Sequence, residues 1–186
     1  MICYLIRHGQ DDESVRGGWC NHGLTDEGKT QVRKLVDYIA ENKDELKIER
    51  IFSSDLPRTV ETATPIAEAL NLEIELKPEF RETNNGVLAG MPNDIAKEKY
   101  PGLFWNTLDW DEAYPQGESP RAFYERVKTA WETFSEKIVK DNKNVVLVTH
   151  GGVINVIYTL IKGKTFSNKM KMEDVARATM IPLEFN

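Results

Sequence analysis

Apolar residues along this chain form short continuous runs that alternate with longer stretches of helical periodicity. The runs predict strands over residues 2–6, 48–53, 72–76, 145–149 and 179–185. The periodic stretches predict helices that follow Thr25, Pro57, Ser119 and His150. Strands that alternate with helices in this way are typical of an α/β domain with a largely parallel sheet. Ligands of such domains bind at the carboxyl ends of the strands, so the polar residues that follow each strand are the first candidates for a site.

Capping residues and prolines refine these helices. Thr25 and Ser119 each supply an N-cap hydroxyl, and Pro57 suits the first turn of the helix that runs to about Leu70. Pro65 removes a backbone donor inside that helix, so we expect a kink or two abutting helices there. Residues 77–118 lose the periodicity and are rich in Asn, Gly, Pro and Trp, which predicts a loop region that covers a substrate.

Size and charge narrow the classes of partner. A chain of 186 residues can bury the core of one domain, and we expect residues 1–186 to form it. Its 24 Lys and Arg against 30 Asp and Glu give a net charge of −6, which disfavours nucleic acid and anionic membranes. Two cysteines, no signal peptide and no apolar stretch of bilayer length predict a cytoplasmic protein.

Cationic and glycine-containing motifs follow three of the predicted strands. They are Arg7-His8-Gly9, the segment Ser53-Ser54-Asp55 that leads to Arg58, and His150-Gly151-Gly152. Each motif alone has a structural explanation, because a single histidine at a strand end is more often a hydrogen-bonded structural residue. Together they predict a positive pocket, in which arginine donors and the backbone N–H groups of a helix start would bind phosphate. A neutral imidazole held there is a competent nucleophile toward phosphorus.

These motifs have the order found in one protein family. The segment Tyr4 to Gln10 resembles the signature of the histidine phosphatase superfamily, which includes phosphoglycerate mutases and related phosphatases. The resemblance extends through residues 23–28, 53–63, 80–90, 117–119 and 149–152. It implies a single domain with a phosphoglycerate mutase-like fold, a three-layer α/β/α sandwich around a mostly parallel sheet.

The resemblance also implies a role for each candidate residue. His8 would accept the phosphoryl group as a phosphohistidine, while Arg7, Arg58 and His150 hold its oxygens. Glu82 would protonate the leaving oxygen and then deprotonate the attacking water; without the resemblance, this residue looks like a solvated loop glutamate. The reaction needs no metal and no cofactor, and the oligomeric state is left open.

Some residues depart from the family pattern or allow two explanations. Ser14 stands where many members have a phosphate-binding asparagine, and Arg16 adds a further positive charge as a substrate ligand. The acidic run at residues 11–13 either faces outward or selects a cationic or hydroxyl group. Cys20 and His22 are too few ligands for zinc. The aromatic residues in the irregular segment either pack as core or line the pocket mouth; they are Phe104, Trp105, Trp110 and Tyr114.

The leading hypothesis is therefore a metal-independent phosphomonoesterase that acts on a small phosphorylated substrate through His8. A mutase of the phosphoglycerate type is the first alternative, and the compact chain argues against it because the resemblance implies longer insertions in true mutases. A non-catalytic module that binds phospholigands is the second alternative. It would not need a nucleophile and a proton donor together.

Overall fold

The computed structural model describes residues 1–170 and 173–185. Its strands are β1 (Ile2–Arg7), β2 (Ile48–Ser53), β3 (Ile74–Leu76), β4 (Asn144–Thr149) and β5 (Met180–Glu184). The α-helices are α1 (Asp26–Glu41), α2 (Lys43–Leu46), α3 (Pro57–Leu70), α4 (Asn93–Lys99), α5 (Pro120–Asp141) and α6 (Gly151–Ile161). Two 3-10 turns, η1 (Pro78–Phe80) and η2 (Gly86–Leu88), lie between β3 and α4.

The strands form one sheet in the order β3-β2-β4-β1-β5. β1, β2, β3 and β4 pair in parallel, and β5 adds an antiparallel strand at the edge beside β1. In the central pair, Arg7 of β1 lies opposite Thr149 of β4. Because the two strands end level with each other, the residues that follow them, His8 and His150, emerge side by side. The predicted α/β class with a mostly parallel sheet is confirmed.

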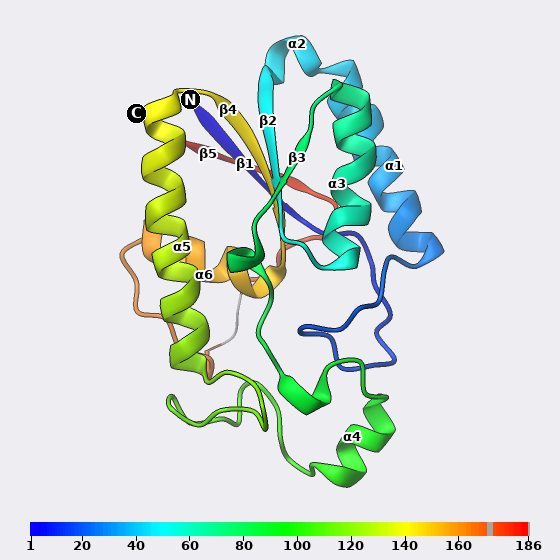
Figure 1. Ribbon diagram of the computed structural model, residues 1–186, viewed down its shortest axis with the longest axis vertical. Coiled ribbons are helices and arrows are strands. Elements are labelled where there is room, and N and C mark those ends of the chain that lie inside the picture. Colours follow the sequence, from blue (N-terminus) through cyan, green and yellow to red (C-terminus); the bar gives the residue numbers. More distant parts are fainter. Residues whose placement is uncertain (171–172, 186) are drawn as a thin grey trace.

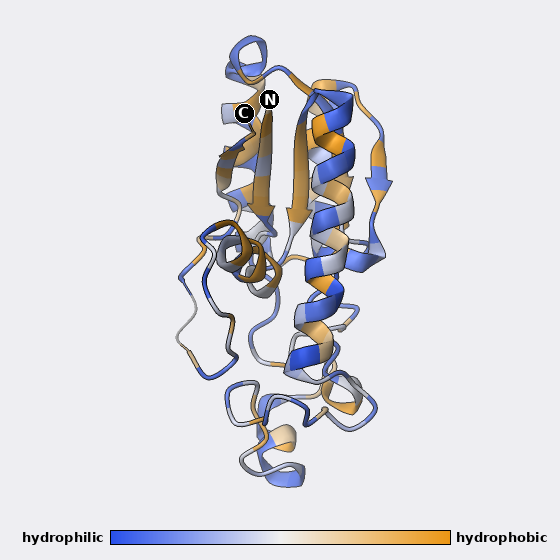
Figure 2. Cartoon of the chain, turned by 90° about the vertical axis from the view of Figure 1, so that its left-hand side faces the viewer, coloured by the Kyte–Doolittle hydropathy of each residue, from blue (hydrophilic) through white to orange (hydrophobic). Residues whose placement is uncertain are grey.

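Helices cover both faces of this sheet, which gives the predicted three-layer sandwich (Figure 1). The alternation of side chains along β1 shows why its whole run is apolar: Cys3 and Leu5 pack in the core under α5 and α6, whereas Tyr4 and Ile6 pack under α1 and α3. Figure 2 shows the result as continuous hydrophobic strands beside a long helix, α5, that is hydrophobic along one stripe only.

The two predicted N-cap hydroxyls are confirmed. The hydroxyl of Thr25 accepts a hydrogen bond from the Gly28 N–H at the start of α1, and that of Ser119 accepts one from the Ala122 N–H at the start of α5. The prediction of two abutting helices at Pro65 is wrong, because α3 runs through this residue as one helix. Packing outweighs the lost donor here, since Ile66 and other residues on the inner face of α3 are buried against the sheet.

Residues 77–118 lie beyond the carboxyl ends of the parallel strands, at the lower end of Figure 1. This segment has more structure than its sequence predicts: it forms η1, η2 and α4 around a small apolar cluster of its own. Leu88, Ala96 and Leu108 are buried in that cluster. A substrate-covering role for the segment stays a prediction.

The helices of the described residues include none that is both long enough and apolar enough to span a bilayer. The cytoplasmic location and the absence of nucleic-acid partners stay predictions from composition.

Candidate active site

His8 lies directly after β1 and is almost completely buried. Its backbone N–H donates to the Thr149 carbonyl of β4 at 3.0 Å, which continues the sheet pairing up to the site. Its ring has Nδ1 2.7 Å from the Gly9 carbonyl and Nε2 3.2 Å from Nε of Arg58. A carbonyl requires a proton on Nδ1 and a guanidinium N–H requires a lone pair on Nε2, so the ring is neutral with Nε2 unprotonated. Burial and the charge of Arg58 also hold the pKa of His8 well below its usual value.

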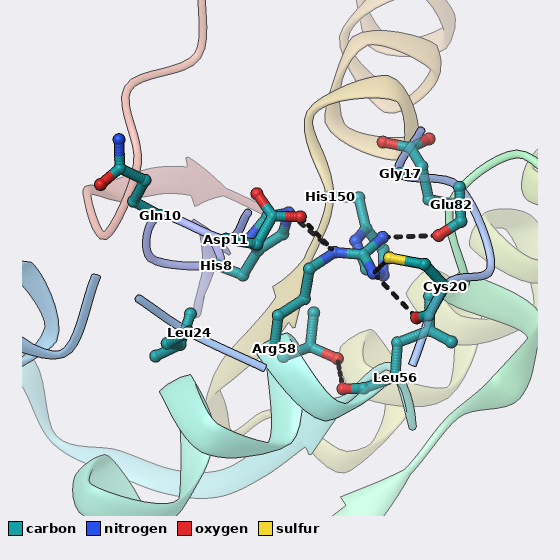
Figure 3. A network of polar contacts seen from close by, with 12 residues as sticks. His8, Gln10, Asp11, Gly17, Cys20, Leu24, Leu56, Arg58, Glu82 and His150 are labelled. Atoms are coloured by element: carbon teal, nitrogen blue, oxygen red, sulfur yellow. Dashed lines mark hydrogen bonds and ion pairs between the residues drawn. The ribbon is translucent and has the colours of Figure 1, made fainter. Parts of the chain in front are cut away.

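Arg58 comes from the first turn of α3 and is 1% exposed. Besides His8, its guanidinium donates to the Gly18 carbonyl at 2.7 Å and to the carbonyl and Sγ of Cys20 at 3.4 and 3.5 Å. Its Nε also lies 3.4 Å from a carboxylate oxygen of Asp11 (Figure 3). Arg58 is thus a buried cation held at a set position next to the unprotonated nitrogen of His8.

His150 directly follows β4 and occupies the N-cap position of α6, with no exposed surface. Its Nε2 lies 3.0 Å from the Ser54 hydroxyl, and its ring is 5.2 Å from the ring of His8 in an edge-to-face arrangement. Burial, with Arg58 as the next cause, holds the pKa of His150 well below its usual value. Its buried Nδ1 has no hydrogen-bond partner within residues 1–170 and 173–185. A buried ring nitrogen without a partner is suited to a ligand that completes its hydrogen bonding.

Arg7, His8 and Glu82 line a pocket of about 520 Å³. Arg7 donates from Nη1 to the Val175 carbonyl at 2.7 Å, while its Nε has no partner among the described residues. The Glu82 carboxylate accepts from the backbone N–H groups of Gly152 and Thr83, each at 3.1 Å. The first of these donors belongs to the start of α6, so Glu82 and His150 are tied to the same helix end.

A second set of residues holds the Glu82 backbone, and the sequence alone did not show it. Arg126 of α5 donates to the carbonyl of Glu82 at 3.1 Å and to the Glu118 carboxylate at 2.6 Å. Nε1 of Trp19 donates to the same Glu82 carbonyl at 2.6 Å, and Arg81 forms a bidentate pair with Asp55. Three of these residues fall in recognised motifs, but a motif does not show which side chains meet across the fold.

The pocket contains most of the predicted site residues and excludes others. Arg58 and His150 are buried behind His8, and Trp110 lies elsewhere, against Tyr124 and Phe166. Of the predicted ligands and aromatic residues, the pocket is lined by Arg7, His8, Arg16, Glu82, Gly151, Phe104, Trp105 and Tyr114. Both explanations for the aromatic residues are therefore realised, and Tyr114 belongs to a small core as well as to the pocket.

Ser14 does not join this cluster. It is exposed, and its hydroxyl donates to the Asp12 carboxylate at 2.6 Å instead of pointing toward His8. Asp12 and Glu13 face outward, as one of the two explanations for the acidic run predicts. Asp11 differs from both explanations, because it turns inward to pair with Arg58 and lies 3.7 Å from Arg177. The short Ser14 side chain bonds within its own turn, which is common for serine in loops.

The segment after α6 also contributes to the site, although no sequence pattern predicts a role for it. Val175 lines the pocket and accepts the hydrogen bond from Arg7, and the Ala178 N–H donates to the Arg7 carbonyl at 2.9 Å. Arg177 pairs with Glu13 at 2.6 Å. No motif marks these residues; only the antiparallel return of β5 beside β1 brings them here.

Cys20 and His22 do not form a metal centre with a third ligand. The Cys20 thiol is buried and accepts from Arg58. Within the described part of the chain, no group of three or more His, Cys, Asp or Glu side chains could hold a metal ion.

Comparison with known proteins identifies the family of the chain. The family model of the histidine phosphatase superfamily (branch 1) matches residues 3–186. Phosphoserine phosphatase 1 of Hydrogenobacter thermophilus is 32% identical over 170 residues, which cover 88% of this chain and 77% of that protein. The 2,3-bisphosphoglycerate-dependent phosphoglycerate mutase of Bartonella henselae is 27% identical over 192 residues, covering 98% of this chain and 91% of the relative.

A solved structure shows the same fold. The α-ribazole phosphatase of Shigella flexneri superposes with a TM-score of 0.83 at 23% identity, covering 100% of this chain and 91% of that one. The match to the family model over nearly all residues, together with a relative above 30% identity, is sufficient to assign the family. The chain belongs to the histidine phosphatase superfamily and is an enzyme of the phosphatase or mutase type.

Proposed function

We propose that this protein is a metal-independent phosphomonoester hydrolase of the histidine acid phosphatase type, which acts on a small phosphorylated metabolite through a phosphohistidine on His8. One observation carries the proposal: the unprotonated Nε2 of a neutral His8 meets the buried Arg58 cation beside a pocket that also contains Arg7 and Glu82. A nucleophile, cations for the phosphoryl oxygens and a carboxyl group for proton transfer are what this reaction needs.

In the first half of the reaction, Nε2 of His8 attacks phosphorus and the bond to the ester oxygen breaks. The lone pair of Nε2 accepts from Arg58 in the free enzyme. When the substrate enters, the Arg58 N–H therefore donates to a phosphoryl oxygen instead of to His8. The lone pair of Nε2 is then free to attack. Arg7 supplies positive charge to the remaining oxygens, while His150 and the Gly151 N–H at the start of α6 donate hydrogen bonds to them. The departing oxygen takes a proton from the Glu82 carboxyl group and leaves as an alcohol.

In the second half, water attacks phosphorus, Glu82 takes its proton, and the bond to Nε2 breaks. Inorganic phosphate leaves, and His8 returns to its neutral form. Glu82 is thus an acid in one step and a base in the next.

Hydrolysis is preferred over mutase chemistry because the pocket opens to solvent, so that water reaches the intermediate. The length of the chain supports hydrolysis only weakly. A relative named as a mutase matches this chain over nearly the full length of both proteins. Length therefore does not separate the two activities.

His8→Ala tests the mechanism most directly. We expect it to abolish release of phosphate from a panel of phosphoesters, measured with a chelator present, and to abolish acid-labile labelling of the protein by a 32P-labelled substrate. His22→Asn is the matched control, because His22 is a histidine outside the pocket lining. This variant should retain both signals.

Other outcomes would overturn the proposal in different ways. Turnover that persists in His8→Ala would exclude the phosphohistidine. Conversion of 3-phosphoglycerate to 2-phosphoglycerate faster than phosphate release would make the protein a mutase. Tight binding of phosphate without turnover of any ester would make it a binding module.

A further inference from the structure

Arg16 lines the same pocket as His8 and has no anionic partner. Its guanidinium forms no salt bridge and no hydrogen bond with any residue in the described part of the chain, and its Nε is shielded from solvent. The side chain instead lies over the ring of Phe104, with the guanidinium carbon 4.5 Å from the ring centre. A partly buried cation without an acceptor is costly unless a ligand supplies one.

The backbone around Arg16 is held rigidly beside the phosphate site. The Arg16 N–H donates to the Met91 carbonyl at 2.8 Å, and the Arg16 carbonyl accepts from the Gly90 N–H at 2.8 Å. Two residues later, the Gly18 carbonyl accepts from Arg58, the cation that contacts His8. The Arg16 loop is therefore tied to the reacting centre through Arg58, and its cation is preorganised.

Carboxylates in the pocket wall are engaged elsewhere and do not neutralise Arg16. Glu82 accepts from the Gly152 and Thr83 backbone, and Glu173 pairs with Lys162 at 2.6 Å. The charge of Asp174 acts on Arg7, where it opposes the lowering of the pKa by burial. The positive charge of Arg16 is thus available to a ligand that enters the pocket.

Further polar groups line the same pocket as Arg16. Nε1 of Trp105, a residue that also lines the pocket, is a buried donor without a partner among the described residues. Tyr114 lines the pocket as well; burial raises its pKa to about 12, and the nearby charge of Arg16 opposes that rise. This part of the wall therefore offers donors, a cation and aromatic faces, in contrast to a surface that selects an apolar group.

We propose that Arg16, stacked on Phe104, binds a second anionic group of the substrate, a carboxylate or a second phosphate, while the phosphoester lies at His8. This inference rests on the proposed function, because it concerns the substrate of that site. It assigns the substrate class as phosphoesters with two anionic groups. Arg16 is then a specificity-determining residue, whereas Arg7 and Arg58 act on the phosphoryl group of every substrate.

Arg16→Met tests this proposal, because methionine keeps an unbranched chain against Phe104 and removes only the charge and the donors. Two substrate pairs separate the sources of the second charge. O-phosphoserine and O-phosphoethanolamine differ by a carboxylate, and fructose 1,6-bisphosphate and fructose 6-phosphate differ by a phosphate. Arg121→Met is the matched control, since Arg121 lies over Trp110 outside this pocket.

We expect the native enzyme to have a lower KM for the substrate with two anionic groups in at least one pair. Arg16→Met should raise that KM by about 10- to 100-fold. The KM of the partner substrate that lacks the second anion should change by less than about 2-fold, and kcat should change little for both. The pair that responds identifies the anion. Equal losses for both members of each pair, or no loss, would overturn the proposal.

Binding measured without turnover distinguishes failure of this inference from failure of the proposed function. In His8→Ala, the affinity measured by calorimetry for the preferred ester with two anionic groups should still exceed that for the ester that lacks the second group. Adding Arg16→Met should remove this difference. Selective binding with no hydrolysis in the native protein would contradict only the proposed function. Hydrolysis without selectivity in either measurement would contradict only the role of Arg16.

Discussion

The position of the Glu82 carboxylate depends on the absence of a side chain at Gly152. A Cβ added at Gly152 would lie 2.3 Å from Oε1 of Glu82, closer than the two atoms can approach. The Gly152 backbone does not have a positive φ, so the helix itself accepts alanine there. The glycine is therefore needed for the carboxylate and not for the backbone.

Gly152→Ala should lower kcat/KM toward the value of Glu82→Gln, a loss of about 10²- to 10⁴-fold, because the carboxylate is pushed out of place. Thermal unfolding should show that the variant is folded, since alanine is favoured over glycine within a helix by about 0.5–1 kcal/mol. Steady-state kinetics on one phosphoester measures the effect.

A double variant supplies the control. Once Glu82 is alanine, the atoms that clash with the new Cβ are gone, so adding Gly152→Ala should cost no further activity. Independent, additive losses would mean that Gly152 acts through contacts other than Glu82.

Among the helices, α3 combines Arg58, for which we propose a catalytic role, in its first turn with Pro65 in its middle. Pro65 cannot donate to the Glu61 carbonyl one turn earlier, and the exposed position of Glu61 lets water satisfy that group. The buried inner face of α3 holds the helix together despite this loss.

Pro65→Ala should therefore raise the free energy of unfolding, by up to about 3 kcal/mol, because it restores a hydrogen bond and a helix-favouring residue. Pro57→Ala in the same helix is the matched comparison. Pro57 occupies the first turn, where no donor is missing, so its replacement should not stabilise the protein. Denaturant unfolding of both variants measures the difference, and equal effects would show that Pro65 is not strained.

For the molecule as a whole, His8 and His150 couple stability to pH. Both pKa values are held well below the usual 6.5 by burial and by Arg58. The unfolded chain therefore binds two protons near pH 6.5 that the folded protein does not take up until much lower pH. Protonation of the unfolded chain therefore lowers the free energy of unfolding as the pH falls below 6.5. Above pH 6.5 both states have neutral rings, and this loss of stability is absent.

The free energy of unfolding, measured in phosphate-free buffer, should fall between pH 6.5 and 5 with a slope that approaches about 1.4 kcal/mol per pH unit for each histidine. His8→Asn should remove about half of this slope, whatever it does to the absolute stability. An unchanged slope would assign the effect to other groups. Added phosphate should also stabilise the native protein more than His8→Asn if the anion binds at this site.

Periodicity and caps in the sequence were sufficient to predict the strands, the long helices and the α/β class. These features are local: the apolar runs of β1 and β4, the stripe of α5 and the hydroxyls of Thr25 and Ser119 each act within one element. Where nonlocal packing decided the outcome, local patterns did not predict the continuity of α3 or the secondary structure within residues 77–118. Packing against the sheet kept α3 whole at Pro65, and residues 77–118 formed turns and a helix around a small core.

The motifs predicted that His8, Arg58 and His150 belong to one site, because parallel strands end at the same edge of a sheet. Glu82 was added to that site only by the family resemblance. Their contacts were decided only by the tertiary structure. Packing across the fold set the tautomer of His8 through Arg58, turned Asp11 inward, left Ser14 in solvent and gave Arg16 an aromatic support without an anionic partner. The physical reason is that a hydrogen bond or an ion pair depends on distances between residues far apart in the chain, whereas periodicity and motif spacing record only their order.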